Sequence, residues 1–91
     1  MTPPSAKIEI YTALFCPFCI RAKQLLETKQ AAYEEIDVTA KLSLRRAMTE
    51  RAGGRTSVPQ IFIDGYPIGG CDELLALDRS GQLDRMLKVA S

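Results

Sequence analysis

The sequence predicts an α/β fold: a four-stranded mixed β-sheet flanked by helices, in the element order β-α-β-α-β-β-α. The first observation behind this prediction is that a helical run separates two strand-like segments, 7–11 and 36–38, which should therefore pair in parallel. The second is the dipeptide Asp64-Gly65 between two apolar segments, because a two-residue Asp-Gly link is a strong signal for a tight hairpin. One sheet with parallel and antiparallel pairs satisfies both observations.

The first elements follow from local patterns. Residues 1–6 are small or polar and include two prolines, so we expect a frayed lead-in. Residues 7–11 alternate charged and apolar side chains, as a half-buried strand does. A helix is expected over about 17–29, because apolar side chains recur there at helical spacing, and residues 36–38 form the second strand.

A second helix is expected over residues 40–52. Thr39 is placed to cap its first turn, since a threonine hydroxyl can accept a hydrogen bond from a free amide there. Gly53-Gly54 should terminate the helix, because glycine readily adopts the left-handed conformation that ends many helices.

The C-terminal part should complete the sheet and cover it. The hairpin strands are expected at 60–63 and 66–69. Pro67 suggests that the second of them lies at an edge of the sheet, because proline has no N–H to donate. Two helices, 72–78 and 82–89, follow, the last as a possible addition to the basic order.

Size and composition exclude several classes of protein. The 91 residues are expected to form a single domain and a monomer, and 46% apolar with 25% charged residues is ordinary for a globular protein. A net charge of +1 argues against a nucleic-acid surface, and no apolar run approaches the about 20 residues of a membrane span. The short polar N-terminus resembles no secretory signal, so we expect a cytoplasmic protein, in which cysteines stay reduced unless they do redox work.

The segment Cys16-Pro17-Phe18-Cys19 lies at the junction between the first strand and the first helix. Pro17 suits the first helical position, because it has no N–H to leave unsatisfied there. Cys16 then becomes the N-cap, where free amides and the helix dipole stabilise an anion. Such sites lower a cysteine pKa from about 8.5 to roughly 3.5–7.5, so we predict that Cys16 is a nucleophile in disulfide exchange.

Cys19 follows one helical turn later, on the same side but deeper, and is predicted to resolve the disulfide that Cys16 forms. Two other interpretations compete with a redox pair. The cysteines could be small buried residues of a helix start. A zinc site would need four ligands, usually cysteine or histidine, but the chain has three cysteines and no histidine, so no metal site is expected.

Two later segments are candidates for the other half of an active site. Val58-Pro59 precedes a strand, and a cis bond there would turn the backbone of Val58 outward to pair with an extended ligand. An ordinary trans turn is the alternative, and the residues alone favour it. Gly69-Gly70-Cys71-Asp72 combines close backbone approach with a helix start that could accept a carboxylate, or is simply a glycine turn with a cap.

Four arginines cluster in and after the second helix, at positions 45, 46, 51 and 55. Such a run is usually a solvated face. One of them, Arg45 or Arg46, could instead bind the carboxylate of a ligand.

Four motifs follow one another along the chain. They are Tyr11-Thr12, Cys16-Pro17-Phe18-Cys19, Arg55-Thr56-Ser57-Val58-Pro59-Gln60-Ile61-Phe62-Ile63 and Ile68-Gly69-Gly70-Cys71-Asp72-Glu73-Leu74. In this order, they resemble the motifs of the dithiol glutaredoxins. The resemblance runs from Ile8 to about Leu87 and implies a thioredoxin-like fold with a cis bond before Pro59. It also implies reduction of protein disulfides and protein–glutathione mixed disulfides, with glutathione as co-substrate and without a tightly bound cofactor.

The resemblance also implies roles for individual residues. Cys16 would attack and Cys19 would resolve, so that the two form the redox-active disulfide. The backbone of Val58 would pair with the cysteinyl part of glutathione, the helix start at Cys71-Asp72 would hold the γ-glutamyl end, and Arg45 would approach the glycyl carboxylate. The full set expected to bind glutathione is Phe18, Arg45, Ser57, Val58, Pro59, Gly70, Cys71 and Asp72.

The sequence departs from the family pattern at Ala13, where relatives usually carry a lysine that steadies the thiolate and a glutathione carboxylate. The pKa of Cys16 is therefore expected to fall less than in those relatives. Phe18 stands where tyrosine is common, which keeps an aromatic wall but removes a hydroxyl.

Two other functions stay open. One is a disulfide reductase that takes its electrons from thioredoxin reductase. The other is a carrier of an iron–sulfur cluster bridged by Cys16 of two subunits and two glutathiones. Pro17 disfavours the carrier, because cluster-binding relatives generally have a smaller or more flexible residue there.

Overall fold

The structure is a computed structural model that describes residues 6–87. Its elements follow the predicted order and include the additional terminal helix. They are β1 (Ile8–Thr12), α1 (Pro17–Thr28), β2 (Glu34–Asp37), α2 (Leu42–Arg51), β3 (Gln60–Ile63), β4 (Tyr66–Gly69), α3 (Cys71–Arg79) and α4 (Gln82–Leu87). Residues 1–5 of the lead-in expected over 1–6 and the last residues of the helix expected over 82–89 lie outside the described part of the chain. Ala6 is partly buried and packs against the core, so the lead-in ends before it.

The four strands form one mixed sheet in the order β2-β1-β3-β4. β1 pairs in parallel with β2, with Tyr11 opposite Ile36, and antiparallel with β3. β3 and β4 form an antiparallel hairpin through Asp64 and Gly65, whose φ angles are 52° and 84°. Two positive φ angles are what a type I′ turn requires. The predicted mixed sheet and tight hairpin are confirmed.

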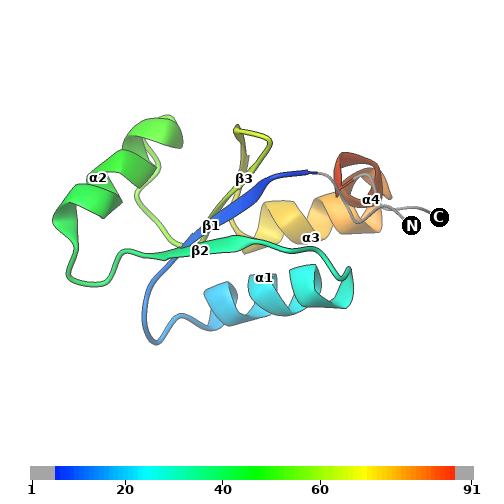
Figure 1. Cartoon of the computed structure of the whole chain (residues 1–91), viewed down its shortest axis with the longest axis horizontal. Coiled ribbons are helices and arrows are strands. Elements are labelled where there is room, and N and C mark those ends of the chain that lie inside the picture. Colours follow the sequence, from blue (N-terminus) through cyan, green and yellow to red (C-terminus); the bar gives the residue numbers. More distant parts are fainter. Residues whose placement is uncertain (1–5, 88–91) are drawn as a thin grey trace.

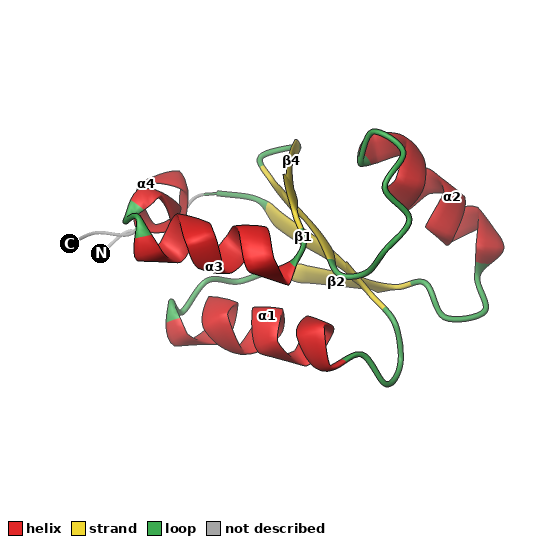
Figure 2. Ribbon diagram, turned by 180° about the vertical axis from the view of Figure 1, so that it is seen from behind, coloured by secondary structure: helices red, strands yellow, loops and turns green. Residues whose placement is uncertain are grey.

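Helices cover both faces of the sheet (Figure 1). α1, α3 and α4 pack on one face and α2 on the other, as the reverse view in Figure 2 shows. The alternation of β1 divides its side chains between the two faces: Ile10 packs with Leu26 of α1, and Tyr11 packs with Met48 of α2. Fully burying such an apolar side chain contributes about 1.5–3 kcal/mol. A shift of β1 by one residue would turn Ile10 and Tyr11 to the wrong faces of the sheet. Packing on both faces therefore fixes the register of β1, and with it the position of the loop that follows.

Thr39 does not cap α2, so this prediction is wrong. The helix begins at Leu42 after Lys41, and no side chain caps it. The Thr39 hydroxyl instead accepts a hydrogen bond from the Leu14 N–H at 2.9 Å, while the Thr39 N–H donates to Asp37 Oδ1 at 2.8 Å. Thr39 therefore ties the β1–α1 loop to the end of β2, a contact between distant segments that competes with local capping.

Other element boundaries differ by one or two residues. β2 lies earlier than expected, because it is an edge strand whose exposed acidic residues hide the usual alternation. α3 begins at Cys71 with Gly70 as its N-cap, one residue before the predicted start. The end of α2 before Gly53, which has a φ of 68°, and the edge position of Pro67 in β4 are as predicted. Among residues 6–87, no helix combines the length and apolar character that a bilayer span requires.

Candidate active site

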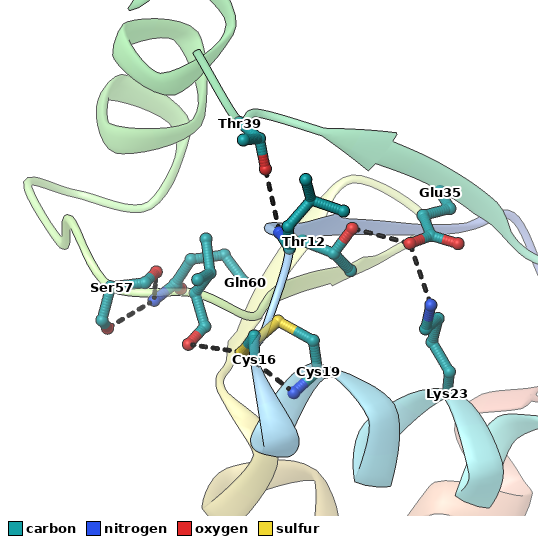
Figure 3. Close-up of a disulfide and its surroundings, with 10 residues drawn as sticks. Thr12, Cys16, Cys19, Lys23, Glu35, Thr39, Ser57 and Gln60 are labelled. Carbon is teal, nitrogen blue, oxygen red and sulfur yellow. Dashed lines mark hydrogen bonds and ion pairs between the residues drawn. A yellow bond between two sulfur atoms is a disulfide. The ribbon is translucent and has the colours of Figure 1, made fainter. Parts of the chain in front are cut away.

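Cys16 and Cys19 form a disulfide at the start of α1, just beyond the end of β1 (Figure 3). As predicted, Cys16 is the N-cap and Pro17 the first helical residue. The Cys19 N–H donates a hydrogen bond to Cys16 Sγ over 3.1 Å. An amide of the first helical turn therefore points at this sulfur, an arrangement that favours negative charge on it once the disulfide is reduced.

The two cysteines differ in their access to solvent. The side chain of Cys19 is buried, with 1% exposed, whereas Cys16 is partly exposed. Of the two residues, Cys16 is therefore the one that a disulfide on another molecule can approach. This difference supports a pair in which Cys16 attacks the substrate and Cys19 then resolves the disulfide that Cys16 has formed.

The turn before β3 lies directly beside the disulfide. Its Val58-Pro59 peptide bond is cis, and the Val58 carbonyl oxygen lies 3.9 Å from Cys16 Sγ. The buried amide of Gln60 donates to the Ser57 carbonyl at 3.0 Å and to the Ser57 hydroxyl oxygen at 3.3 Å, which fixes the preceding backbone (Figure 3). No role was predicted for Gln60, although a polar residue at the start of an otherwise apolar strand is a signal for such a contact.

The start of α3 forms the opposite wall of the site. Glu73 folds back so that its Oε1 accepts a hydrogen bond from the Gly70 N–H at 2.6 Å. The same oxygen lies 3.3 Å from Arg55 Nη2. Gly69 has a φ of 111°, and a Cβ built there would come within 2.7 Å of the Glu73 carboxylate, so the turn needs glycine. The Gly70 N–H, and secondarily Arg55, hold the pKa of Glu73 below its usual value, which keeps this carboxylate ionised.

A groove of about 210 Å³ lies between these walls. Cys16 is next to it, because Val58, whose carbonyl oxygen is 3.9 Å from Cys16 Sγ, is one of the lining residues. Most of the residues proposed for glutathione line it, and they come from α1, the turn before β3 and the start of α3. The fold thus brings together residues more than fifty positions apart in the chain. The lining residues are Phe18, Arg55, Ser57, Val58, Pro59, Gly70, Cys71, Asp72 and Glu73.

The arginines are arranged differently from expectation. Arg45, the predicted carboxylate ligand, lies outside the groove lining, and its Nη1 donates to the Thr56 carbonyl at 3.0 Å. It is therefore next to the turn before β3 without being part of the groove wall. Arg55 lines the groove instead; it begins the motif that ends at Ile63, but no binding role was predicted for it.

Cys71 is the free cysteine among residues 6–87, and it is buried with 4% of its surface exposed. Burial, together with the nearby Asp72 and Glu73 carboxylates, raises the pKa of its thiol above the usual value, against a smaller opposing effect of Arg21. Cys71 therefore stays a protonated thiol in the groove wall and is a poor nucleophile at neutral pH.

Comparison with known proteins gives a consistent result. The glutaredoxin family model matches residues 8–68. The chain is 51% identical over 83 residues to glutaredoxin 3 of Escherichia coli strain K12, which covers 91% of this chain and 99% of that protein.

Two solved structures are similar over most of their length. The solution structure of glutaredoxin from Brucella melitensis superposes with a TM-score of 0.79 at 48% identity, covering 93% of this chain and 91% of that one. The crystal structure of a buckwheat glutaredoxin–glutathione complex superposes with a TM-score of 0.82 at 29% identity, and the match covers 93% of this chain and 79% of that one. This chain therefore belongs to the glutaredoxin family and is a glutathione-dependent thiol–disulfide oxidoreductase with a Cys-x-x-Cys active site.

Proposed function

We propose that this enzyme reduces protein–glutathione mixed disulfides and protein disulfides, with glutathione as the electron donor. One observation carries the proposal: the accessible sulfur of Cys16 sits at a helix N-cap, 3.9 Å from the Val58 carbonyl, beside a groove lined by a peptide turn and a helix start. The related buckwheat protein, solved in complex with glutathione, supports the choice of ligand.

Glutathione would lie along the groove with its sulfur toward Cys16. The backbone of Val58 would pair with the cysteinyl part, as an added strand pairs with a sheet edge. The first amides of α3, at Cys71 and Asp72, would hold the γ-glutamyl carboxylate, because a helix N-terminus attracts anions. Arg45, next to Thr56, would approach the glycyl carboxylate.

A mixed disulfide would be reduced with Cys16 alone. Its thiolate attacks the glutathione sulfur of the substrate, the new Cys16–glutathione disulfide forms, and the protein leaves as a thiolate. A second glutathione thiolate then attacks the glutathione sulfur held on Cys16. Glutathione disulfide leaves, and the Cys16 thiolate is restored. The net exchange converts the mixed disulfide and one free glutathione into the protein thiol and glutathione disulfide, which also contains the glutathione that the substrate carried.

A protein disulfide would need both cysteines. Cys16 forms a mixed disulfide with the protein, and Cys19 then attacks the sulfur of Cys16, which releases the reduced protein and leaves the Cys16–Cys19 disulfide. Glutaredoxin potentials near −200 to −230 mV lie about 40–70 mV above that of thioredoxin, roughly 2–3 kcal/mol for two electrons. That difference lets glutathione act as the reductant of the Cys16–Cys19 disulfide.

This chemistry would need no resident cofactor, since glutathione enters and leaves as a substrate. The reducing, glutathione-containing cytoplasm is the compartment that fits it, with the enzyme acting as a monomer on glutathionylated or disulfide-containing proteins.

The experiment that tests this proposal is glutathione-dependent turnover of the mixed disulfide between cysteine and glutathione. The wild type should turn it over, and Cys16→Ser should not, because serine cannot form the intermediate disulfide. A parallel assay with thioredoxin reductase in place of glutathione identifies the reductant. Activity that needs thioredoxin reductase, or that survives in Cys16→Ser, would refute the proposal.

A further inference from the structure

The segment around the disulfide has an unusually apolar surface. Of the six large hydrophobic side chains that are exposed within residues 6–87, four lie between positions 14 and 20, and the other two are Leu42 and Tyr66. We call these four side chains the apolar rim. They are Leu14, Phe15, Phe18 and Ile20, exposed by 60%, 98%, 52% and 53%.

Phe15 is the most unusual member of the rim. It is almost completely exposed, and its backbone has a φ of 55°, a conformation that bulky residues rarely adopt. Burial in the core does not compensate for this conformation, because the side chain is in solvent. Phe15 immediately precedes Cys16 in the chain. The hydrogen bond from the Leu14 N–H to Thr39 holds the loop just before it. The fold therefore presents Phe15 to solvent next to the reactive sulfur.

Helix geometry places two other members, Phe18 and Ile20, beside the redox pair. They are the residues on either side of Cys19 in α1, and neighbouring helical residues point about 100° apart. Because Cys19 is buried while both neighbours are exposed, Phe18 and Ile20 reach the surface on opposite sides of Cys19. Phe18 also lines the glutathione groove, whereas Leu14, Phe15 and Ile20 do not. Most of the rim is thus outside the surface that glutathione is proposed to occupy.

We propose that the apolar rim binds the polypeptide that carries the substrate disulfide, and that it selects extended segments with large apolar residues beside the cysteine. This inference rests on the proposed function. The substrate disulfide must come within bonding distance of Cys16 Sγ, so the chain that carries it must pass over the residues around that sulfur. Large apolar side chains on this chain would remove the rim from water.

An extended segment can place several side chains near the rim while its cysteine is at Cys16. It advances about 3.3 Å per residue and points successive side chains to opposite sides, so residues within three positions of the cysteine can reach the rim. Apolar residues beside a cysteine are often buried in folded proteins, so partly unfolded chains would present such segments more readily. The substrates that the rim would select are therefore exposed cysteines that lie in apolar sequence.

The test uses two peptides of equal length, each with one glutathionylated cysteine, flanked on both sides by leucine in one peptide and by serine in the other. For the wild type, kcat/KM for the leucine peptide should exceed that for the serine peptide by about tenfold, since partial burial of one aromatic side chain is worth about that factor. Phe15→Asn should bring the preference below about threefold, and Leu14→Ser should reduce it in the same direction. Asparagine is chosen because it tolerates a positive φ.

Two controls separate this inference from the proposed function. Tyr66→Asn removes an aromatic side chain that is 71% exposed at the start of β4, at the other end of the sheet from Cys16, and should leave the preference intact. The small mixed disulfide between cysteine and glutathione should be turned over equally by wild type and Phe15→Asn. If the wild type fails on this small substrate, the proposed function fails; if it succeeds but treats both peptides alike, the apolar rim is not a substrate site.

A second copy of the chain is the competing occupant of the rim. Sedimentation velocity at micromolar concentrations should show the same monomer for wild type and Phe15→Asn. A wild-type dimer that dissociates in Phe15→Asn would overturn the inference, because the rim would then be a self-association surface.

Discussion

Arg55 and Glu73 join the two walls of the groove: Arg55 Nη2 lies 3.3 Å from Glu73 Oε1, and the same oxygen accepts the Gly70 N–H at 2.6 Å. Arg55 belongs to the segment before the cis turn, and Glu73 to the first turn of α3. The two side chains are 48% and 45% exposed, so solvent weakens the ion pair itself. We therefore expect Glu73 to act mainly by positioning the Gly70 turn, through its hydrogen bond from the Gly70 N–H.

Glu73→Ala should therefore raise KM for glutathione by about fivefold with little change in kcat, because a hydrogen bond of about 1 kcal/mol that positions the groove wall is lost. Steady-state kinetics over a range of glutathione concentrations measures this. Glu50→Ala, at an exposed glutamate of α2, is the matched control and should behave as wild type. An unchanged KM in Glu73→Ala would mean that the glycine turn holds its shape alone.

Stability should depend on pH through Glu9 and Arg51. Arg51 contacts both carboxylate oxygens of Glu9, at 2.9 and 3.2 Å, and its guanidinium lies 4.1 Å from the centre of the Phe62 ring. The hydrogen bonds from Arg51 lower the pKa of Glu9 below its usual value. A lowered folded-state pKa adds stability that is present above the unfolded pKa of about 4.3 and disappears as the pH falls through the folded value.

Glu9→Gln should therefore lower the free energy of unfolding by about 1 kcal/mol at neutral pH, where the wild-type carboxylate is charged. Below the folded-state pKa both proteins carry a neutral side chain at position 9, so their stabilities should converge. Urea denaturation at pH 7 and at about pH 2.5 measures both differences. If the free energies of unfolding of wild type and Glu9→Gln differ by the same amount at both pH values, packing and not charge explains the lower stability of the variant.

Cys19→Ser separates the two proposed routes. Reduction of glutathione mixed disulfides uses Cys16 alone and should be kept, whereas reduction of a protein disulfide should be lost because no thiol remains to resolve the intermediate. Assays with a glutathionylated peptide and with a disulfide-containing protein such as insulin give the two rates. Cys71→Ser is the matched control, since it removes a buried thiol outside the redox pair. Retained protein-disulfide reduction in Cys19→Ser would contradict the scheme.

Ala13 is partly buried against the core that contains Tyr11 and Met48, so it places no charge near the active-site loop. Ala13→Lys should lower the pKa of reduced Cys16 and lower KM for glutathione, because the lysine stem can lie over the same apolar surface with its ammonium in solvent. Ala13→Met is the control for side-chain length. Alkylation rate against pH reports the thiol pKa.

In the wild type, the helix N-terminus alone should still keep the midpoint of alkylation below the unperturbed value of about 8.5. A wild-type midpoint near 8.5 would refute that part of the prediction. An unchanged KM for glutathione in Ala13→Lys would refute the other.

The features that could be predicted from the sequence depend on neighbouring residues. Pro17 fixes the first helical position and thus the place of Cys16, and Asp64-Gly65 fixes the hairpin, because each acts through its own backbone preferences. The cis state of Val58-Pro59 is different: the residues alone favoured a trans turn, and only the family resemblance predicted the cis bond that the structure has.

The features that could not be predicted are contacts between distant segments. Thr39 had a suitable local role as a cap, but its hydroxyl accepts from Leu14, 25 positions earlier. Arg55 belongs to a motif, but its place in the groove wall depends on a contact with Glu73, 18 positions later in the chain. The exposure of Phe15 could not be predicted either, because an apolar residue between a strand and a helix is also compatible with a place in the core.

The two edges of the sheet affect how the enzyme can handle unfolded chains. Three of the four residues of β2 are acidic, and β4 carries Pro67, which has no N–H to donate. Charges and proline on edge strands discourage a foreign strand from adding to the sheet. A partly unfolded client held at the apolar rim would therefore meet edges that resist its β-pairing. If the apolar rim binds such clients as proposed, the enzyme would reduce them without offering a sheet edge on which they could aggregate.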